Sequence, residues 1–190
     1  ETKTVLSNLD KPHGISFFDN KLYITEETKV SRYLWNEENL SASLDKELFS
    51  LPKGGRHITR TIDFDKNGKM YVSVGSSCNV CEETTEGRAA ILEYNPDGTG
   101  YRVFATGLRN TVGFVFHHTT GEIWGTDNGR DYLGDNLPPD EINIIRDGKN
   151  YGWPKCYGKK IPDPVFNDSV FCETSTATLY NVQAHSATIG

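Results

Sequence analysis

The sequence lacks any apolar run close to the roughly 20 residues that a membrane-spanning helix requires, so no membrane span is expected. It also lacks an excess of positive charge: 20 Lys and Arg stand against 26 Asp and Glu in 190 residues, a formal net charge of −6. Nucleic acids and anionic membrane surfaces attract clustered Lys and Arg. The acidic balance therefore argues against both as partners.

Motifs of several large enzyme classes are missing as well. No GxGxxG, P-loop or GxSxG pattern occurs, which leaves nucleotide cofactors and serine hydrolysis without support. The chain opens at Glu1 with neither an initiator methionine nor a signal peptide, and we expect it to be a processed or partial chain. Helical periodicity is nearly absent, and short β-rich runs separated by Asn, Asp and Gly turns predict an all-β fold.

One order of elements occurs three times along the chain. An apolar strand leads through a tight turn to a strand that carries an aromatic residue, and a further strand follows after a loop. The matching aromatics are Tyr23, Tyr71 and Trp124, which lie 48 and 53 residues apart (71 − 23 and 124 − 71). A period of about 40–50 residues per four-stranded unit is typical of a β-propeller blade. A β-sandwich does not require the same order three times, so a propeller is favoured over a sandwich.

The repeats predict one partial β-propeller domain over residues 1–190. The expected blades cover residues 1–44, 45–98 and 99–150, and residues 151–190 begin a fourth that stays incomplete. Known propellers have roughly 4–8 blades, so about three and a half blades cannot close. Because an open ring leaves unpaired edge strands, we expect further blades or a partner to complete it.

The four cysteines form two local pairs, Cys78 with Cys81 and Cys156 with Cys172. A zinc site at the first pair would need further ligands nearby, and haem attachment would need a His where Glu82 stands. A redox-active pair would need a helix N-terminus to lower a thiol pKa, whereas the preceding residues are typical of a loop. A structural disulfide is favoured for the first pair, and the second pair is expected to close an acidic loop.

Local cysteine pairing of this kind is typical of an oxidising compartment. Two N-x-S sequons, at Asn39 and Asn167, favour the same setting. We therefore expect a secreted or periplasmic protein.

Polar residues precede the first apolar run of each repeat. They are His13, His57 and the pair Arg109-Asn110. One end of every innermost strand of a propeller faces its central channel, so these residues are expected around one channel mouth. An isolated His in a β-protein is more often a hydrogen-bonded structural residue than a catalyst, so a more specific pattern is needed to assign a function.

Such a pattern occurs in the second and third repeats. It comprises residues 54–57 (GGRH), 75–81 (GSSCNVC), 107–113 (GLRNTVG), 121–124 (GEIW), 127–131 (DNGRD), 137–143 (LPPDEIN) and 148–154 (GKNYGWP). Over nearly its whole length the chain resembles the pyrroloquinoline-quinone (PQQ)-dependent glucose/sorbosone dehydrogenases, which are six-bladed β-propellers. Residues 78–81 and 138–141 are more similar to the sorbosone- or pyranose-dehydrogenase branch than to the bacterial soluble glucose dehydrogenases.

The resemblance implies roles for three residues around the quinone. His57 matches the family's catalytic base, which takes the proton of the sugar's C1 hydroxyl as hydride passes to the quinone. A His with an unperturbed pKa of about 6.5 suits that role. Arg109 matches the cationic residue that stabilises the anion developing on reduction, and Asn110 matches a polar contact of the quinone.

The resemblance also implies a Ca²⁺ site. Gly129 and Arg130 match positions whose backbone carbonyls bind Ca²⁺, a hard cation that prefers oxygen ligands. Asn128 and Asp140 match side chains that lie beside the cofactor and the substrate.

The chain departs from the family pattern at three positions within it. Glucose dehydrogenases carry an acidic residue that orients the catalytic His at the position of Ser76, which predicts a weaker partner for His57. Asn128 replaces a Gln, and Arg130 replaces a Pro. The Lys and Arg residues that bind the PQQ carboxylates lie in later blades of the family, and their counterparts are expected beyond Gly190.

The predicted function is that of a sugar oxidoreductase, a PQQ-dependent enzyme that oxidises an aldose or sorbosone at its C1 hydroxyl or aldehyde with the assistance of Ca²⁺. Its partners would be a small-molecule sugar and an external electron acceptor such as a cytochrome. One alternative is a non-catalytic carbohydrate- or protein-binding propeller that has lost quinone binding. Another is a Ca²⁺-dependent sugar lactonase, which would need a carboxylate cluster formed by Asp127, Asp131 and Asp140.

Overall fold

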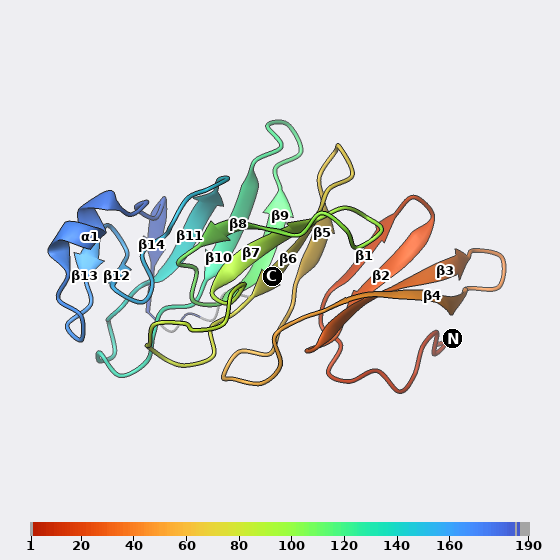
Figure 1. Ribbon diagram of the computed structural model, residues 1–190, viewed down its shortest axis with the longest axis horizontal. Coiled ribbons are helices and arrows are strands. Elements are labelled where there is room, and N and C mark those ends of the chain that lie inside the picture. Colours follow the sequence, from red (N-terminus) through yellow and green to blue (C-terminus); the bar gives the residue numbers. More distant parts are fainter. Residues whose placement is uncertain (1, 185, 187–190) are drawn as a thin grey trace.

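The computed structural model describes residues 2–184 and residue 186. Sheet dominates it, and three four-stranded antiparallel sheets follow one another along the long axis of the molecule (Figure 1). Among the described residues, no helix has the length and apolar character needed to cross a membrane.

The first two sheets are simple meanders, in which each strand pairs with the next one along the chain. The first sheet contains β1 (Ile15–Phe18), β2 (Lys21–Thr25), β3 (Lys29–Asn36) and β4 (Ser41–Ser50). The second sheet contains β5 (Ile62–Phe64), β6 (Met70–Val74), β7 (Ala90–Tyr94) and β8 (Arg102–Thr106).

The third sheet takes its outer strand from much later in the chain. Its order is β9-β10-β11-β14, with β9 (Thr111–Phe116), β10 (Ile123–Asp127), β11 (Asp140–Ile145) and β14 (Tyr180–Val182). Between β11 and β14 the chain forms the hairpin of β12 (Cys156–Tyr157) and β13 (Ile161–Pro162), and then the helix α1 (Ser169–Thr174). Residues 151–190, which the repeat pattern assigns to an incomplete fourth blade, thus supply the strand that completes the third sheet.

The first strands of the three sheets lie side by side. β1 contacts β5, and β5 contacts β9, as the inner strands of neighbouring blades do around a propeller channel. This arrangement confirms the prediction of an all-β, β-propeller fold. It also brings together the loops that precede β5 and β9, which carry His57 and Arg109.

Aromatic residues at matching positions of the repeats join each sheet to the next. Tyr23 is 1% exposed, and its ring centroid lies 4.7 Å from that of Phe64 in the second sheet. Tyr71 makes edge-on contacts with Phe104 of its own sheet and Phe116 of the third, at 5.1 and 5.2 Å. The repeating aromatic in the sequence therefore corresponds to a repeating interface between blades.

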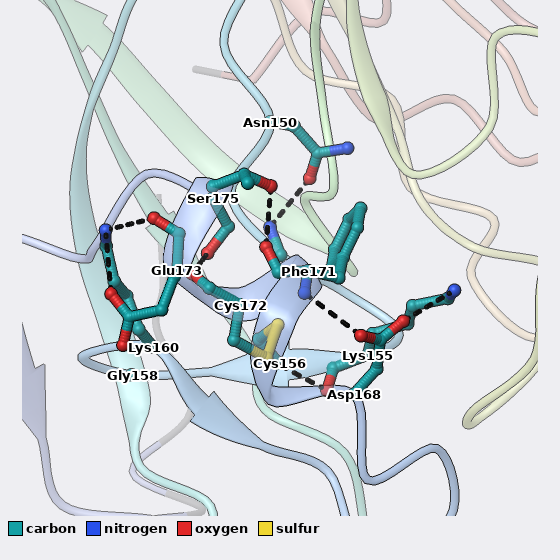
Figure 2. Close-up of a disulfide and its surroundings, with 12 residues drawn as sticks. Asn150, Lys155, Cys156, Gly158, Lys160, Asp168, Phe171, Cys172, Glu173 and Ser175 are labelled. Carbon is teal, nitrogen blue, oxygen red and sulfur yellow. Dashed lines mark hydrogen bonds and ion pairs between the residues drawn. A yellow bond between two sulfur atoms is a disulfide. The ribbon is translucent and has the colours of Figure 1, made fainter.

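Both predicted cysteine pairs are disulfides. The Cys78–Cys81 bond closes a loop after β6, and the Cys156–Cys172 bond ties β12 to α1 (Figure 2). At the start of α1, the carboxylate of Asp168 accepts a hydrogen bond from the Phe171 amide at 3.0 Å, which caps the helix. The second disulfide thus fixes the excursion that separates β11 from β14.

We expect Ile91 in β7 to be a sensitive core position. Its side chain is 0% exposed and lies in the cluster between the second and third sheets. Because Ile91→Ala leaves a cavity there, the free energy of unfolding of the full-length protein should fall by about 2–5 kcal/mol, measured by urea denaturation. The control Val170→Ala, at a position that is 78% exposed, should change it by less than about 0.5 kcal/mol. Equal losses in the two variants would contradict this core.

Candidate active site

An open cavity lies where the loops before β5 and β9 meet the loop after β10. Its volume is about 330 Å³. Its lining is polar and carries both signs of charge: Arg56, His57, Arg109, Asn110, Asn128, Gly129, Asp131 and Asp140. Every predicted site residue except Arg130 borders this cavity, and Arg130 directly follows Gly129. His13, which the sequence places at the same channel mouth, is exposed and does not line it.

A buried arginine fixes the backbone that carries His57. Arg60 is 0% exposed and donates hydrogen bonds to the carbonyls of His57 at 3.0 Å, Thr59 at 2.8 Å and Pro52 at 3.0 Å. Burial lowers the pKa of Arg60 to about 10, so it stays charged near pH 7. Since a buried charge is tolerated only with such partners, the loop before β5 has little freedom to move.

Ser76 determines which nitrogen of His57 carries the proton. Nδ1 of His57 lies 3.0 Å from the carbonyl oxygen of Ser76 and 2.9 Å from its Oγ. That Oγ donates its own hydrogen to the carbonyl of Cys78 at 2.7 Å, so it can only accept from His57. Two acceptors facing one ring nitrogen require the proton on Nδ1 and leave Nε2 as the basic atom.

The surroundings of His57 disfavour its charged form. Burial lowers the pKa of His57 to about 4, and the positive charges of Arg109 and Arg56 act in the same direction. The Ser76 carbonyl and Asp131 oppose this shift without reversing it. His57 is therefore neutral near pH 7, the state in which an imidazole can accept a proton.

Asp127, at the end of β10, shapes the turn that presents Arg109 and Asn110. Its carboxylate accepts hydrogen bonds from the amides of Arg109 at 2.9 Å and Asn110 at 2.8 Å, and from the hydroxyl of Thr111 at 2.9 Å. Burial raises the pKa of Asp127 to about 6 in spite of these hydrogen bonds. The turn before β9 is therefore organised around one buried carboxylate.

The side chain of Arg109 is buried and is held by oxygen acceptors. It is 4% exposed, and its Nε and Nη2 donate to the carbonyl oxygen and the Oδ1 of Asn79 at 2.9 and 2.8 Å. Its Nη1 donates to the carbonyl of Asn128 at 3.2 Å. Desolvation lowers the pKa of Arg109, but an arginine remains charged in proteins. A fixed positive charge thus lies beside His57.

The predicted metal positions present carbonyl oxygens and a carboxylate. The Gly129 amide donates to Oδ1 of Asp140 at 2.8 Å, which places this carboxylate beside the predicted metal positions. The Arg130 side chain is held elsewhere, because its Nη1 lies 3.0 Å from both carboxylate oxygens of the buried Asp163. Oxygen donors of this kind fit Ca²⁺.

The carboxylates that a lactonase would need do not gather around one point. Within the described part of the chain, a single trio of side chains has ligand atoms close enough to share an ion: Cys78, Cys81 and Glu83. Its two cysteines are joined in a disulfide and cannot act as thiolate ligands. Asp127, Asp131 and Asp140 therefore provide no cluster for that alternative.

Sequence reasoning missed three residues that hold the site together. In the sequence, Asn79 stands out only within residues 78–81, and Asp127 only within residues 127–131 and as a carboxylate of the lactonase alternative. Asp163 belongs to the acidic loop that the second cysteine pair is expected to close, and in the structure it is 1% exposed and pairs with Arg130. Each of these residues acts on the backbone or charge of a distant segment, which sequence spacing does not reveal.

Comparisons with known proteins identify the family of this chain. A family model described as TrAA12-like matches residues 1–186. The chain belongs to the TrAA12-like family. A relative in Borreliella burgdorferi, an uncharacterized protein, is 36% identical over 98% of this chain and 53% of that protein. A pyrroloquinoline quinone-dependent sugar dehydrogenase of Hypocrea jecorina is 26% identical over 81% of this chain and 44% of that protein.

A solved structure gives the same fold for this TrAA12-like chain. The calcium structure of a Trichoderma reesei carbohydrate-active enzyme of family AA12 has a TM-score of 0.87 at 20% identity, covering 96% of this chain and 58% of that one. The family match and these relatives confirm the resemblance to PQQ-dependent sugar dehydrogenases. The chain spans about half the length of the curated relatives it matches.

We expect His57 to titrate well below an ordinary histidine. With a pKa of about 4 in the folded protein and about 6.5 in the unfolded chain, the unfolded state binds more protons between these values. The contribution of His57 to stability should therefore be full above about pH 6.5 and be lost as the pH falls toward 4. NMR titration of its ring signals, identified with a His57→Asn variant, measures the midpoint; a midpoint near 6.5 would contradict the buried environment described above.

Gly75 should tolerate no side chain. A Cβ at this position would lie 2.6 Å from the Cβ of His57 and 2.7 Å from Oδ1 of Asn110, so Gly75→Ala must displace one of them. We expect the His57 ring signals to shift and its pKa to move toward 6.5. In the control Val170→Ala, at a position that is 78% exposed, the His57 signals should stay in place. Unchanged signals in both variants would show that Gly75 does not pack against the site.

Proposed function

We propose that this chain provides the base and the cationic side of the active site in a PQQ- and Ca²⁺-dependent sugar dehydrogenase. The substrate would be an aldose or sorbosone, oxidised at its C1 hydroxyl or aldehyde. One observation carries the proposal: His57, with its proton held on Nδ1 by Ser76, offers a basic Nε2 in the same open cavity as the fixed charge of Arg109.

In the proposed reaction His57 accepts the proton of the sugar's hydroxyl. Its Nε2 carries the lone pair, because Nδ1 donates to Ser76. Acceptance of a proton would make the ring cationic, and Asp131, which also lines the cavity, is a negative charge that favours the cation. PQQ, when bound, would supply the acceptor for the hydride that leaves the carbon atom bearing this hydroxyl.

Arg109 and Asn110 would bind the oxygen atoms of the quinone. Asp127 fixes the backbone of both residues, so their positions are set before a ligand arrives. Donors that are fixed in advance stabilise developing negative charge without the cost of reorienting during the reaction. Arg56 also lines the cavity, where its Nη2 donates to the carboxylate of Asp131 at 2.5 Å.

Ca²⁺ would be held by the carbonyl oxygens of Gly129 and Arg130, next to Asp140. The position of Gly129 supports this role, because a Cβ there would lie 2.8 Å from the carbonyl oxygen of Pro139, which keeps the backbone close to β11. The calcium structure of the AA12 enzyme and the PQQ-dependent name of the Hypocrea jecorina relative support the same pair of cofactors.

The remaining parts of the proposal concern the whole protein. Two disulfides support export to an oxidising compartment. An external electron acceptor such as a cytochrome would reoxidise the cofactor, and the Lys and Arg residues that bind PQQ carboxylates would come from further blades.

We expect His57→Ala to reduce sugar-dependent dye reduction by about 10²–10⁴-fold, because the variant lacks the general base. The assay uses the full-length protein with PQQ, Ca²⁺, a panel of aldoses and sorbosone, and an artificial electron acceptor. Affinity for PQQ, measured by equilibrium titration, should change little. His118→Ala, at an exposed turn, serves as the matched control and should keep full activity.

Retained turnover in His57→Ala would show that another group is the base. A folded wild-type protein that binds PQQ but oxidises no sugar in the panel would contradict the proposed substrate class. If it takes up no PQQ at all, the chain belongs instead to a carbohydrate- or protein-binding propeller.

A further inference from the structure

The disulfide loop of Cys78–Cys81 lies against the cavity and contacts its arginine. Asn79, inside this loop, accepts two hydrogen bonds from the guanidinium of Arg109: one on its backbone oxygen at 2.9 Å and one on Oδ1 at 2.8 Å. Two parallel donors to one residue fix both the position and the plane of a guanidinium. The loop therefore controls the direction in which Arg109 points.

Asn79 also joins the loop to Asp131, another residue that lines the cavity. Its Oδ1 accepts from the Asp131 amide at 2.9 Å, and its Nδ2 donates to the Asp131 carbonyl at 3.2 Å. The side-chain amide thus uses both of its ends on two segments that are 30 and 52 residues away from it. Such a bridge cannot be replaced by any apolar side chain.

The disulfide holds Asn79 in the conformation that these contacts need. The ring closed by Cys78 and Cys81 has a sequence separation of only 3, and a loop this short adds less to global stability than a long one. Its main effect is local, because it restricts the backbone on both sides of Asn79. The carbonyl of Cys78 also accepts the hydrogen of Ser76 Oγ at 2.7 Å, so the loop contacts the partner of His57 as well.

We propose that Asn79 is a positioning residue that orients Arg109 toward the cavity, and that the Cys78–Cys81 disulfide keeps Asn79 in place. A guanidinium has five N–H donors, and Asn79 and Asn128 accept three of them. Its Nη2 also lies 3.9 Å from the Asp131 carboxylate. Because Asn79 bonds both to this guanidinium and to the Asp131 backbone, it sets where the remaining donors point. The catalytic consequence of this role rests on the proposed function, whereas the orientation of Arg109 does not.

The orientation is tested without any ligand by hydrogen exchange of the Arg109 Nη2–H protons in the full-length protein. NMR follows these guanidinium protons, and an Arg109→Lys variant identifies them. Asn79→Ala removes Oδ1, the acceptor of Nη2, so exchange of the Nη2–H protons should become about 10- to 100-fold faster, as expected for the loss of a hydrogen bond from a charged donor. The Ile91 amide in β7, at a site that is 0% exposed, reports global unfolding and should keep its rate.

Two further variants separate positioning from a merely structural effect. Asn79→Asp keeps an oxygen acceptor at the same place and should restore most of the protection of Arg109. Val80→Ala changes an apolar neighbour in the same loop and should leave the exchange rate as it is. If exchange of Arg109 is equally slow in Asn79→Ala, or if all three variants accelerate it alike, the proposal is overturned.

The disulfide has a matched control in the second cysteine pair. The double variant Cys78→Ser/Cys81→Ser should accelerate Arg109 exchange as Asn79→Ala does, whereas Cys156→Ser/Cys172→Ser should not. Equal rates in the two double variants would overturn the part of the proposal that concerns the disulfide.

Titration with PQQ then connects orientation to binding. Asn79→Ala should weaken PQQ binding by about tenfold or more, and Asn79→Asp should recover it, if the free donors of Arg109 contact the quinone. A wild-type protein that shows the expected exchange pattern but binds no PQQ contradicts the proposed function and supports the positioning role. Normal exchange in Asn79→Ala, with PQQ still bound and reduced by sugar, contradicts the positioning role and supports the proposed function.

Discussion

The site depends on one buried residue, Ser76, whose hydrogen bonds join the loops that carry His57, Arg109 and Cys78. Its amide donates to the carbonyl of Arg109 at 2.8 Å, and its carbonyl and hydroxyl accept from Nδ1 of His57. Its hydroxyl also donates to the carbonyl of Cys78. Because the residue is 0% exposed, none of these groups can turn to water instead. The relative placement of base and cation therefore follows from the backbone of the short segment after β6.

The repeat in the sequence predicted the fold because each blade has the same order of elements: a strand, a turn and a strand that carries an aromatic residue. The pattern could not predict that β14 completes the third sheet, since residues 151–179 form an excursion with no counterpart in the first two repeats. Long-range contacts attach this excursion: Glu141 in β11 accepts from the Gly158 amide at 2.6 Å, and Arg130 pairs with Asp163. Such contacts leave no periodic trace in a sequence, so the outer strand was assigned to a fourth unit.

The sequence likewise predicted one part of the site and not another. His57, Arg109, Asn110, Asn128, Gly129 and Asp140 could be placed together from family motifs, because those motifs record residues that face a common cavity. The tautomer of His57 could not be predicted, because it depends on a serine hydroxyl whose own hydrogen is directed to the Cys78 carbonyl. The roles of Asn79 and Asp127 could not be predicted either. Asn79 bonds to the guanidinium of Arg109, and Asp127 bonds to the backbone of Arg109 and Asn110, which are distant in sequence.

The serine at position 76, in place of a carboxylate, changes how this site balances the basicity of His57 against the stability of its cation. A carboxylate at position 76 would raise the pKa of the imidazole and stabilise its cation. Ser76 offers only neutral acceptors, and Arg109 lowers the pKa of His57 further. In the proposed reaction the same Arg109 stabilises the negative charge that develops on the cofactor. The charge of Arg109 thus makes His57 a weaker base and at the same time stabilises the product anion. Both effects follow from one buried guanidinium. Removing Arg109 would make His57 more basic and the anion less stable, so the two effects cannot be improved independently at this position.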